Sequence, residues 1–117
     1  PAVVDGVVYV GSWDGNFYAI KASSGQQLWI FQTDNIILSS PAFADGLVYV
    51  GSEDGSLYAF DAASGQQRWS FPTGSGIDSS PAVVDGVVYV GNLDGNIYAL
   101  GNRPPGTPAA ARRSPAT

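Results

Sequence analysis

The 117-residue sequence contains no cysteine, no histidine and no methionine. Without cysteine and histidine the chain has no disulfide, no thiol nucleophile, no zinc-finger site and no histidine-based catalytic triad. Its uninterrupted apolar runs, such as residues 7–10, are about four residues long, whereas a membrane-spanning helix needs about 20. We therefore expect no membrane insertion within this chain. The lack of methionine leads us to expect a piece of a longer polypeptide, with any signal peptide outside the sequence.

Positive charge is also scarce. Ten acidic residues face five basic ones, and three of the five, Arg103, Arg112 and Arg113, lie in the last fifteen residues. Residues 1–102 therefore carry only Lys21 and Arg68 against all ten carboxylates, a net charge of 2 − 10 = −8. A segment with this negative charge repels phosphate backbones and anionic lipid surfaces, so we exclude nucleic acid as a partner.

The sequence repeats with a period of 40 residues. Residues 1–11 recur without change at 81–91 and nearly so at 41–51, and 24 of 40 positions are identical between 1–40 and 41–80. A period this regular indicates an array of structural repeats. The organisation that follows is repeat 1 at 1–40, repeat 2 at 41–80, partial repeat 3 at 81–102, and a tail at 103–117. The tail has four proline and four alanine residues and is predicted to be disordered.

Asp-Gly pairs separate the apolar segments of each repeat. Such a pair between apolar segments is typical of a tight hairpin, because a type I′ turn needs positive φ at both central residues. With turns at Asp5-Gly6, Asp14-Gly15 and Ser24-Gly25, repeat 1 is predicted to form strands over about 2–4, 7–12, 16–22 and 27–32. The two middle strands are apolar on both faces, so both faces should be covered.

Four antiparallel strands in each 40-residue unit indicate an all-β fold of stacked β-propeller blades. The chain would hold two full blades and half of a third. Propellers close with 4–8 blades, and open ends expose apolar faces and unpaired strand edges. Two explanations stay open: the chain is part of a larger ring, or copies of it self-associate to complete one.

A longer motif points to a known family. Residues 59–69, AFDAASGQQRW, and 19–29, AIKASSGQQLW, resemble the tryptophan-docking motif of the PQQ-like (pyrroloquinoline-quinone-like) propeller repeat, with Lys21 in place of the usual Asp. Repeat 3 departs from the motif after Leu100. In the family the motif's Trp packs across the interface between blades. The resemblance therefore implies that the residues that dock the blades are Trp29, Trp69, Ala19, Ala22, Gly25, Ala59, Asp61, Ala62 and Gly65.

The resemblance extends to BamB-like outer-membrane assembly propellers. It implies a non-catalytic protein-interaction scaffold without a cofactor, placed in the periplasm, at the cell envelope or outside the cell. Two alternatives stay open, because a fold does not decide a function. One is a fragment of a PQQ-dependent quinoprotein dehydrogenase. The other is a sensor propeller attached to a bacterial Ser/Thr kinase.

Two local features bear on sites. The alternating residues Asn92, Asp94 and Asn96 carry side-chain oxygens and resemble part of a calcium loop. Gly95, however, lies between the last two of them, whereas the glycine that an EF-hand loop requires follows the third. These residues are therefore interpreted as a hairpin turn, and no metal site is predicted.

Trp13 stands beside a turn where the other repeats have Glu53 and Leu93, and is predicted to be a contact residue.

Overall fold

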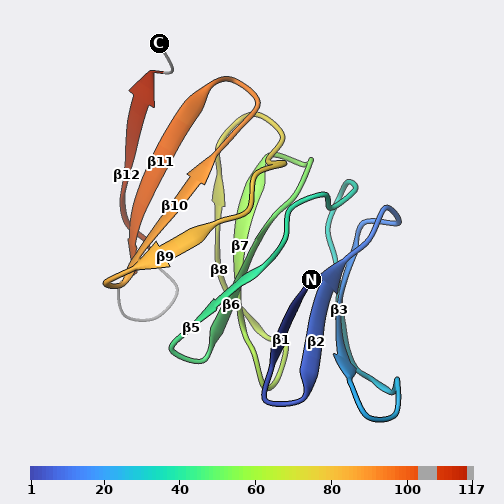
Figure 1. The fold of residues 1–117 in the computed structure, drawn as a ribbon. Coiled ribbons are helices and arrows are strands. Elements are labelled where there is room, and N and C mark those ends of the chain that lie inside the picture. The colour runs from blue at the N-terminus through green and yellow to red at the C-terminus, as the bar shows by residue number, and fades with distance from the viewer. Residues whose placement is uncertain (103–107, 116–117) are drawn as a thin grey trace.

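The computed structural model describes residues 1–102 and 108–115 of the chain. These residues form three antiparallel four-stranded sheets, which we call blades 1 to 3 and which lie side by side in chain order (Figure 1). Blade 1 contains β1 (Ala2–Val4), β2 (Val7–Gly11), β3 (Asn16–Lys21) and β4 (Gln27–Gln32). Blade 2 contains β5 (Ala42–Ala44), β6 (Leu47–Gly51), β7 (Ser56–Asp61) and β8 (Gln67–Pro72). Blade 3 contains β9 (Ala82–Val84), β10 (Val87–Gly91), β11 (Asn96–Asn102) and β12 (Pro108–Pro115).

The predicted all-β propeller architecture is confirmed. Each blade runs from its first strand to its fourth by consecutive antiparallel pairing, and the short first strand β5 lies next to both β1 and β9. The part of the chain that the structure describes contains no helix long and apolar enough to cross a membrane.

The predicted disordered tail differs from the structure over Pro108–Pro115. This segment forms β12, which pairs with β11 and gives blade 3 a fourth strand. Its pairing satisfies backbone N–H and C=O groups along the edge of β11 that would otherwise be exposed. The rest of the predicted tail, 103–107 and 116–117, lies outside the described residues.

The hairpin turns divide into two kinds. Asp5 and Gly6 have φ of 50° and 76°, as a type I′ turn requires, and the equivalent turns of the other blades match. At Asp14-Gly15 the type I′ prediction is wrong, since Gly15 alone has a positive φ, of 88°. There the Gly15 N–H donates to the Ser12 carbonyl and the Ser12 N–H donates to the Asn16 carbonyl, which is a type I turn with a glycine bulge.

Strand register decides which side chains share a face. Residues paired across the ladder point to the same side, so Tyr9, Ala19 and Trp29 share one face of blade 1, while Val8 and Ile20 share the other. We call the face of a blade that turns toward the next blade its C-terminal face, and the opposite one its N-terminal face.

The core lies between blades. Between blades 1 and 2, buried side chains come from the C-terminal face of blade 1 (Tyr9, Phe17, Ala19) and the N-terminal face of blade 2 (Val48, Val50, Phe60). Between blades 2 and 3 the same positions recur as Tyr49, Leu57, Ala59 and Trp69 against Val88, Val90, Tyr98 and Leu100. Blade 2, which is apolar on both faces, thus buries each face against a neighbouring blade, whereas blades 1 and 3 each bury one.

Candidate functional site

Trp29 of β4 crosses from blade 1 to blade 2. Its indole Nε1–H donates to the Ala62 carbonyl at 2.9 Å, and its ring centroid lies 5.8 Å from that of Phe60. Beneath the indole is Gly65, where a Cβ would come within 2.4 Å of Trp29 Cδ2 and where φ is +76°. Only glycine fits both the space and the backbone at this position.

The structure brings together most of the docking residues expected from the motif. At the first interface Trp29 meets Ala62 and Gly65 of the following blade, and Ala19 pairs with Trp29 across β3 and β4. At the second interface Ala59 pairs with Trp69, and both are buried.

Two expected docking residues lie apart from any partner blade. Ala22 is exposed, and a Cβ built on Gly25 meets no atom within 4 Å. The motif of one blade receives the Trp of the blade before it, and the described residues contain no blade before blade 1. The surface formed by Ala22 and Gly25, which would receive the Trp of a preceding blade, is therefore uncovered; we call it the open receptor.

Asp61 acts within its own loop. Its carboxylate accepts hydrogen bonds from the N–H groups of Ala63 and Ser64, at 3.0 Å and 3.1 Å. The same carboxylate lies 3.6 Å from Arg68 Nη1. The residue thus holds the turn that presents Ala62 and Gly65 to the neighbouring blade.

Tyr9 supplies a second polar link between the first two blades. Its hydroxyl donates to the Ala62 carbonyl at 3.3 Å, so that one carbonyl accepts from both Tyr9 and Trp29. Burial raises the pKa of the Tyr9 hydroxyl, and the charges of Asp5 and Asp61 raise it further. The hydroxyl therefore stays protonated and acts as a donor.

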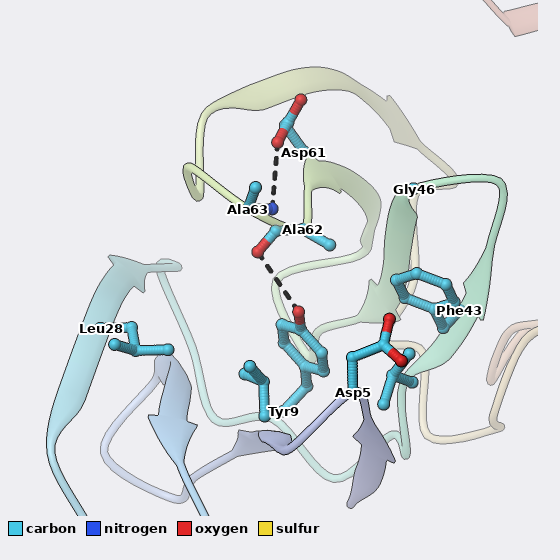
Figure 2. Close-up of a pocket in the computed structure, with 10 residues that line it drawn as sticks. Asp5, Tyr9, Leu28, Phe43, Gly46, Asp61, Ala62 and Ala63 are labelled. Atoms are coloured by element: carbon cyan, nitrogen blue, oxygen red, sulfur yellow. Dashed lines mark hydrogen bonds between the residues drawn. The ribbon is translucent and has the colours of Figure 1, made fainter.

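A pocket of about 460 Å³ opens beside this link (Figure 2). Figure 2 shows Leu28 on one side of Tyr9 and Phe43 and Asp5 on the other, with the Asp61–Ala63 turn above. Its apolar wall and its polar rim together comprise Val4, Asp5, Val7, Tyr9, Leu28, Phe43, Gly46, Asp61, Ala62 and Ala63. The pocket combines an apolar surface with two carboxylates, which suits a ligand with an apolar body and a positive charge.

A strand irregularity places Leu28 at this pocket. Ala19 pairs with Trp29 while Ile20 pairs with Gln27, so Leu28 is the extra residue of a β-bulge. The equivalent residue of blade 2 is Arg68, which pairs with Asp61. The pocket was not predicted from the sequence; the replacement of Arg by Leu between repeats is the signal that could have indicated it.

Comparison with known proteins decides the family. The profile described as outer membrane protein assembly factor BamB matches residues 1–103. The chain belongs to this family. No curated protein sequence matches it.

Solved structures of similar fold include BamB and two quinohemoprotein alcohol dehydrogenases. BamB from Moraxella catarrhalis is 28% identical, with a TM-score of 0.76 over 92% of this chain and 33% of that one. Quinohemoprotein alcohol dehydrogenase ADHIIG from Pseudomonas putida HK5 is 29% identical, with a TM-score of 0.78 over 97% of this chain and 20% of that one. The equivalent enzyme from Comamonas testosteroni is 28% identical, with a TM-score of 0.79 and the same coverage. This BamB-family chain thus spans a fifth to a third of those proteins.

The dehydrogenase neighbours raise the question of a calcium-held quinone. In this BamB-family chain the Asp14 carboxylate already has partners: it accepts from the Asn16 N–H at 2.8 Å and from the Tyr18 hydroxyl at 2.7 Å. The Asn92 side-chain oxygen accepts hydrogen bonds from the N–H groups of Asp94 and Asn96, and these bonds stabilise the hairpin turn. Across residues 1–101 no three Asp or Glu side chains gather as metal ligands. The side chains of Asp14 and Asn92 therefore serve the turns in which they lie.

Trp13 lies at the tip of a turn in the first BamB-type repeat. Its side chain is 73% exposed, the most exposed large apolar residue in the part of the chain whose burial is described. The structure places it in the β2–β3 turn, on a different part of blade 1 from the residues that line the pocket. Its role as a contact residue stays a prediction.

Proposed function

We propose that this chain is a non-catalytic protein-interaction scaffold of the cell envelope. The observation that carries the proposal is the pocket between blades 1 and 2, whose apolar wall and two carboxylates suit a basic and apolar segment of a partner protein. Membership of the BamB family, described as outer membrane protein assembly factors, supports both the scaffold role and a periplasmic compartment.

The chemistry of the pocket favours a positively charged occupant. Asp5 and Asp61 lie at its rim, and residues 1–102 carry a net charge of −8. A surface of one sign attracts partners of the opposite sign and speeds their encounter. Leu28, Phe43 and Tyr9 offer apolar contact to the stem of a lysine or arginine side chain.

The test uses a pair of short synthetic peptides. Both have the same alternating apolar residues, and the remaining positions hold lysine in one peptide and glutamate in the other. Titrated into the isotope-labelled chain, the lysine peptide should shift the NMR signals of the Leu28 methyl groups and the Tyr9 ring, and the glutamate peptide should not.

Leu28→Arg provides the matched control, because the second repeat already has Arg68 at this position. The introduced guanidinium would compete for the Asp61 carboxylate and fill the pocket. The variant should keep the β-sheet circular dichroism and lose the response to the lysine peptide. An equal response to both peptides, or binding that survives in Leu28→Arg, would overturn the proposal.

A second candidate function is a fragment of a quinoprotein dehydrogenase. It is favoured by the two quinohemoprotein alcohol dehydrogenases, each matched over 97% of this chain. Stoichiometric binding of the quinone in the presence of calcium, followed by absorbance, would support this candidate over the scaffold. Attachment to a Ser/Thr kinase, the third expectation, stays a prediction that no feature of the described residues addresses.

A further inference from the structure

The described part of the chain ends in two uncovered blade faces. At the first end, Val3 and Ile30 on the N-terminal face of blade 1 are 66% and 44% exposed. At the other end, Tyr89 and Ile97 on the C-terminal face of blade 3 are 43% and 53% exposed. Apolar side chains gathered on one face at this exposure mark an interaction surface.

The two faces are the separate halves of an interface that the chain already makes twice. Tyr89 and Ile97 stand at the repeat positions of Tyr9 and Phe17, which are 4% and 0% exposed against blade 2. Ala99 completes the set as the equivalent of Ala19.

The opposite face has matching counterparts. Val8, Val10 and Ile20 stand at the repeat positions of Val48, Val50 and Phe60, which become fully buried against blade 1. In blade 1 they are only half-buried. Sixteen of 20 residues are identical between 1–20 and 81–100, so the first and third blades offer nearly the same backbone and side chains for packing.

We propose that the two end faces bind each other between copies of the chain, with the C-terminal face of blade 3 seated on the N-terminal face of blade 1 of a second copy. The contact is head-to-tail, so it closes into a ring when the rotation between copies allows. Two copies of three blades give six blades, within the 4–8 at which propellers close.

This junction differs from the internal ones in one respect. In repeat 3 the tryptophan motif is absent, so no indole reaches the open receptor at Ala22 and Gly25. The junction therefore lacks the hydrogen bond that Trp29 makes to Ala62. We expect assembly that depends on protein concentration rather than a permanent complex.

The experiment measures the mass of the whole chain in solution by sedimentation equilibrium across a range of concentrations. The mass should rise from 12.1 kDa to about 24 kDa or a higher multiple. A chain that stays at 12.1 kDa at every concentration while keeping its β-sheet circular dichroism overturns the proposal, and would assign the two faces to further blades of a longer polypeptide.

Two variants test the direction of the contact. Val10→Asp places a charge on the N-terminal face of blade 1, and Ile97→Asp places one on the C-terminal face of blade 3. Each variant alone should remain a monomer, and an equimolar mixture should form a dimer, because each retains the face that the other has lost. Association of Ile97→Asp alone, or a mixture that stays monomeric, overturns a head-to-tail contact.

Folding is controlled in two ways. If Val10→Asp loses its circular dichroism signal, Ile30→Asp tests the same face at a more exposed position. Leu93→Asp adds the same charge at a turn residue that is 60% exposed and belongs to neither face, and should associate as the unmodified chain does. If Leu93→Asp also abolishes association, added charge rather than the faces would be the cause and the proposal fails.

Discussion

The indole of Trp29 lies so close to the backbone of Gly65 that a Cβ at residue 65 would come within 2.4 Å of Trp29 Cδ2. The two residues belong to different blades and are 36 positions apart in the sequence. Because the same turn also presents the Ala62 carbonyl to the indole N–H, the glycine and the tryptophan together set how closely blades 1 and 2 approach.

Gly65→Ala should destabilise the chain more than Gly25→Ala. Both glycines have φ of +76°, so each substitution carries a similar backbone cost of about 1–2 kcal/mol. A Cβ at residue 25 meets open space, whereas one at residue 65 must displace the indole, which adds about 1–3 kcal/mol. Urea unfolding at matched protein concentration measures the difference, and equal losses for the two variants would show that the indole contact does not limit blade packing.

Trp69→Ala should lower the free energy of unfolding by about 3–5 kcal/mol, because Trp69 is only 4% exposed and packs in the core between blades 2 and 3. Trp13→Ala removes the same side chain from an exposed turn and should change stability by no more than about 0.5 kcal/mol. Thermal and urea unfolding of both variants provide the comparison. A loss below about 1 kcal/mol for Trp69→Ala contradicts a docking role for this residue.

The blade itself could be predicted from the sequence because its signals are local. Asp5-Gly6 marks a turn that only positive φ at both residues can make, and the 40-residue period fixes where each strand recurs. At Asp14-Gly15 the same dipeptide sits in another kind of turn, because Ser12 and Asn16 close the hairpin through their backbone groups. The dipeptide alone carries no information on that closure.

The pocket was not predicted because its walls come from two blades rather than from one local segment. Tyr9 and Phe43 are far apart in the sequence and meet only when blades 1 and 2 stack. Leu28 reaches the pocket because one extra residue interrupts the pairing of β3 with β4, and a bulge has no residue signature of its own here. The strand β12 was missed because its pairing with β11 follows from an open sheet edge rather than from its own composition.

Tyr18→Phe should raise the pKa of the Asp14 carboxyl toward its ordinary value. In the structure the hydrogen bond from the Tyr18 hydroxyl, followed by that from the Asn16 N–H, holds the Asp14 pKa below that value. A lowered pKa contributes stability above the ordinary range of an aspartate, and that stability is lost as the pH falls through the lowered pKa. The unmodified chain and the variant should therefore converge in stability toward acid pH.

The measurement for this prediction is an NMR titration of the Asp14 carboxyl carbon. Tyr89→Phe removes a hydroxyl from another blade and should leave the Asp14 titration unchanged. An Asp14 pKa that is the same with Tyr18 and with Phe at that position would assign the shift to the turn backbone instead.

Glu53→Gln should stabilise the chain near neutral pH. Glu53 Oε2 is buried without a hydrogen-bond partner, and the pKa of the Glu53 carboxyl is raised, first by its hydrogen bond with Asp78, then by burial and by the Asp78 charge. For a raised carboxyl pKa, the folded state binds more protons than the unfolded one, so stability falls as the pH rises through that pKa. A glutamine carries no negative charge, and its amide can donate a hydrogen bond to Asp78.

The stability gained by Glu53→Gln over the unmodified chain should therefore be present at pH 7 and vanish below the ordinary pKa range of a glutamate. Urea unfolding over that range tests the sign, and Asp78→Asn should produce the same pattern, because it removes the other charge of the pair. A gain for Glu53→Gln that is independent of pH would assign the effect to packing against Gly76, where a Cβ would lie 2.8 Å from Oε2, rather than to the paired carboxyls.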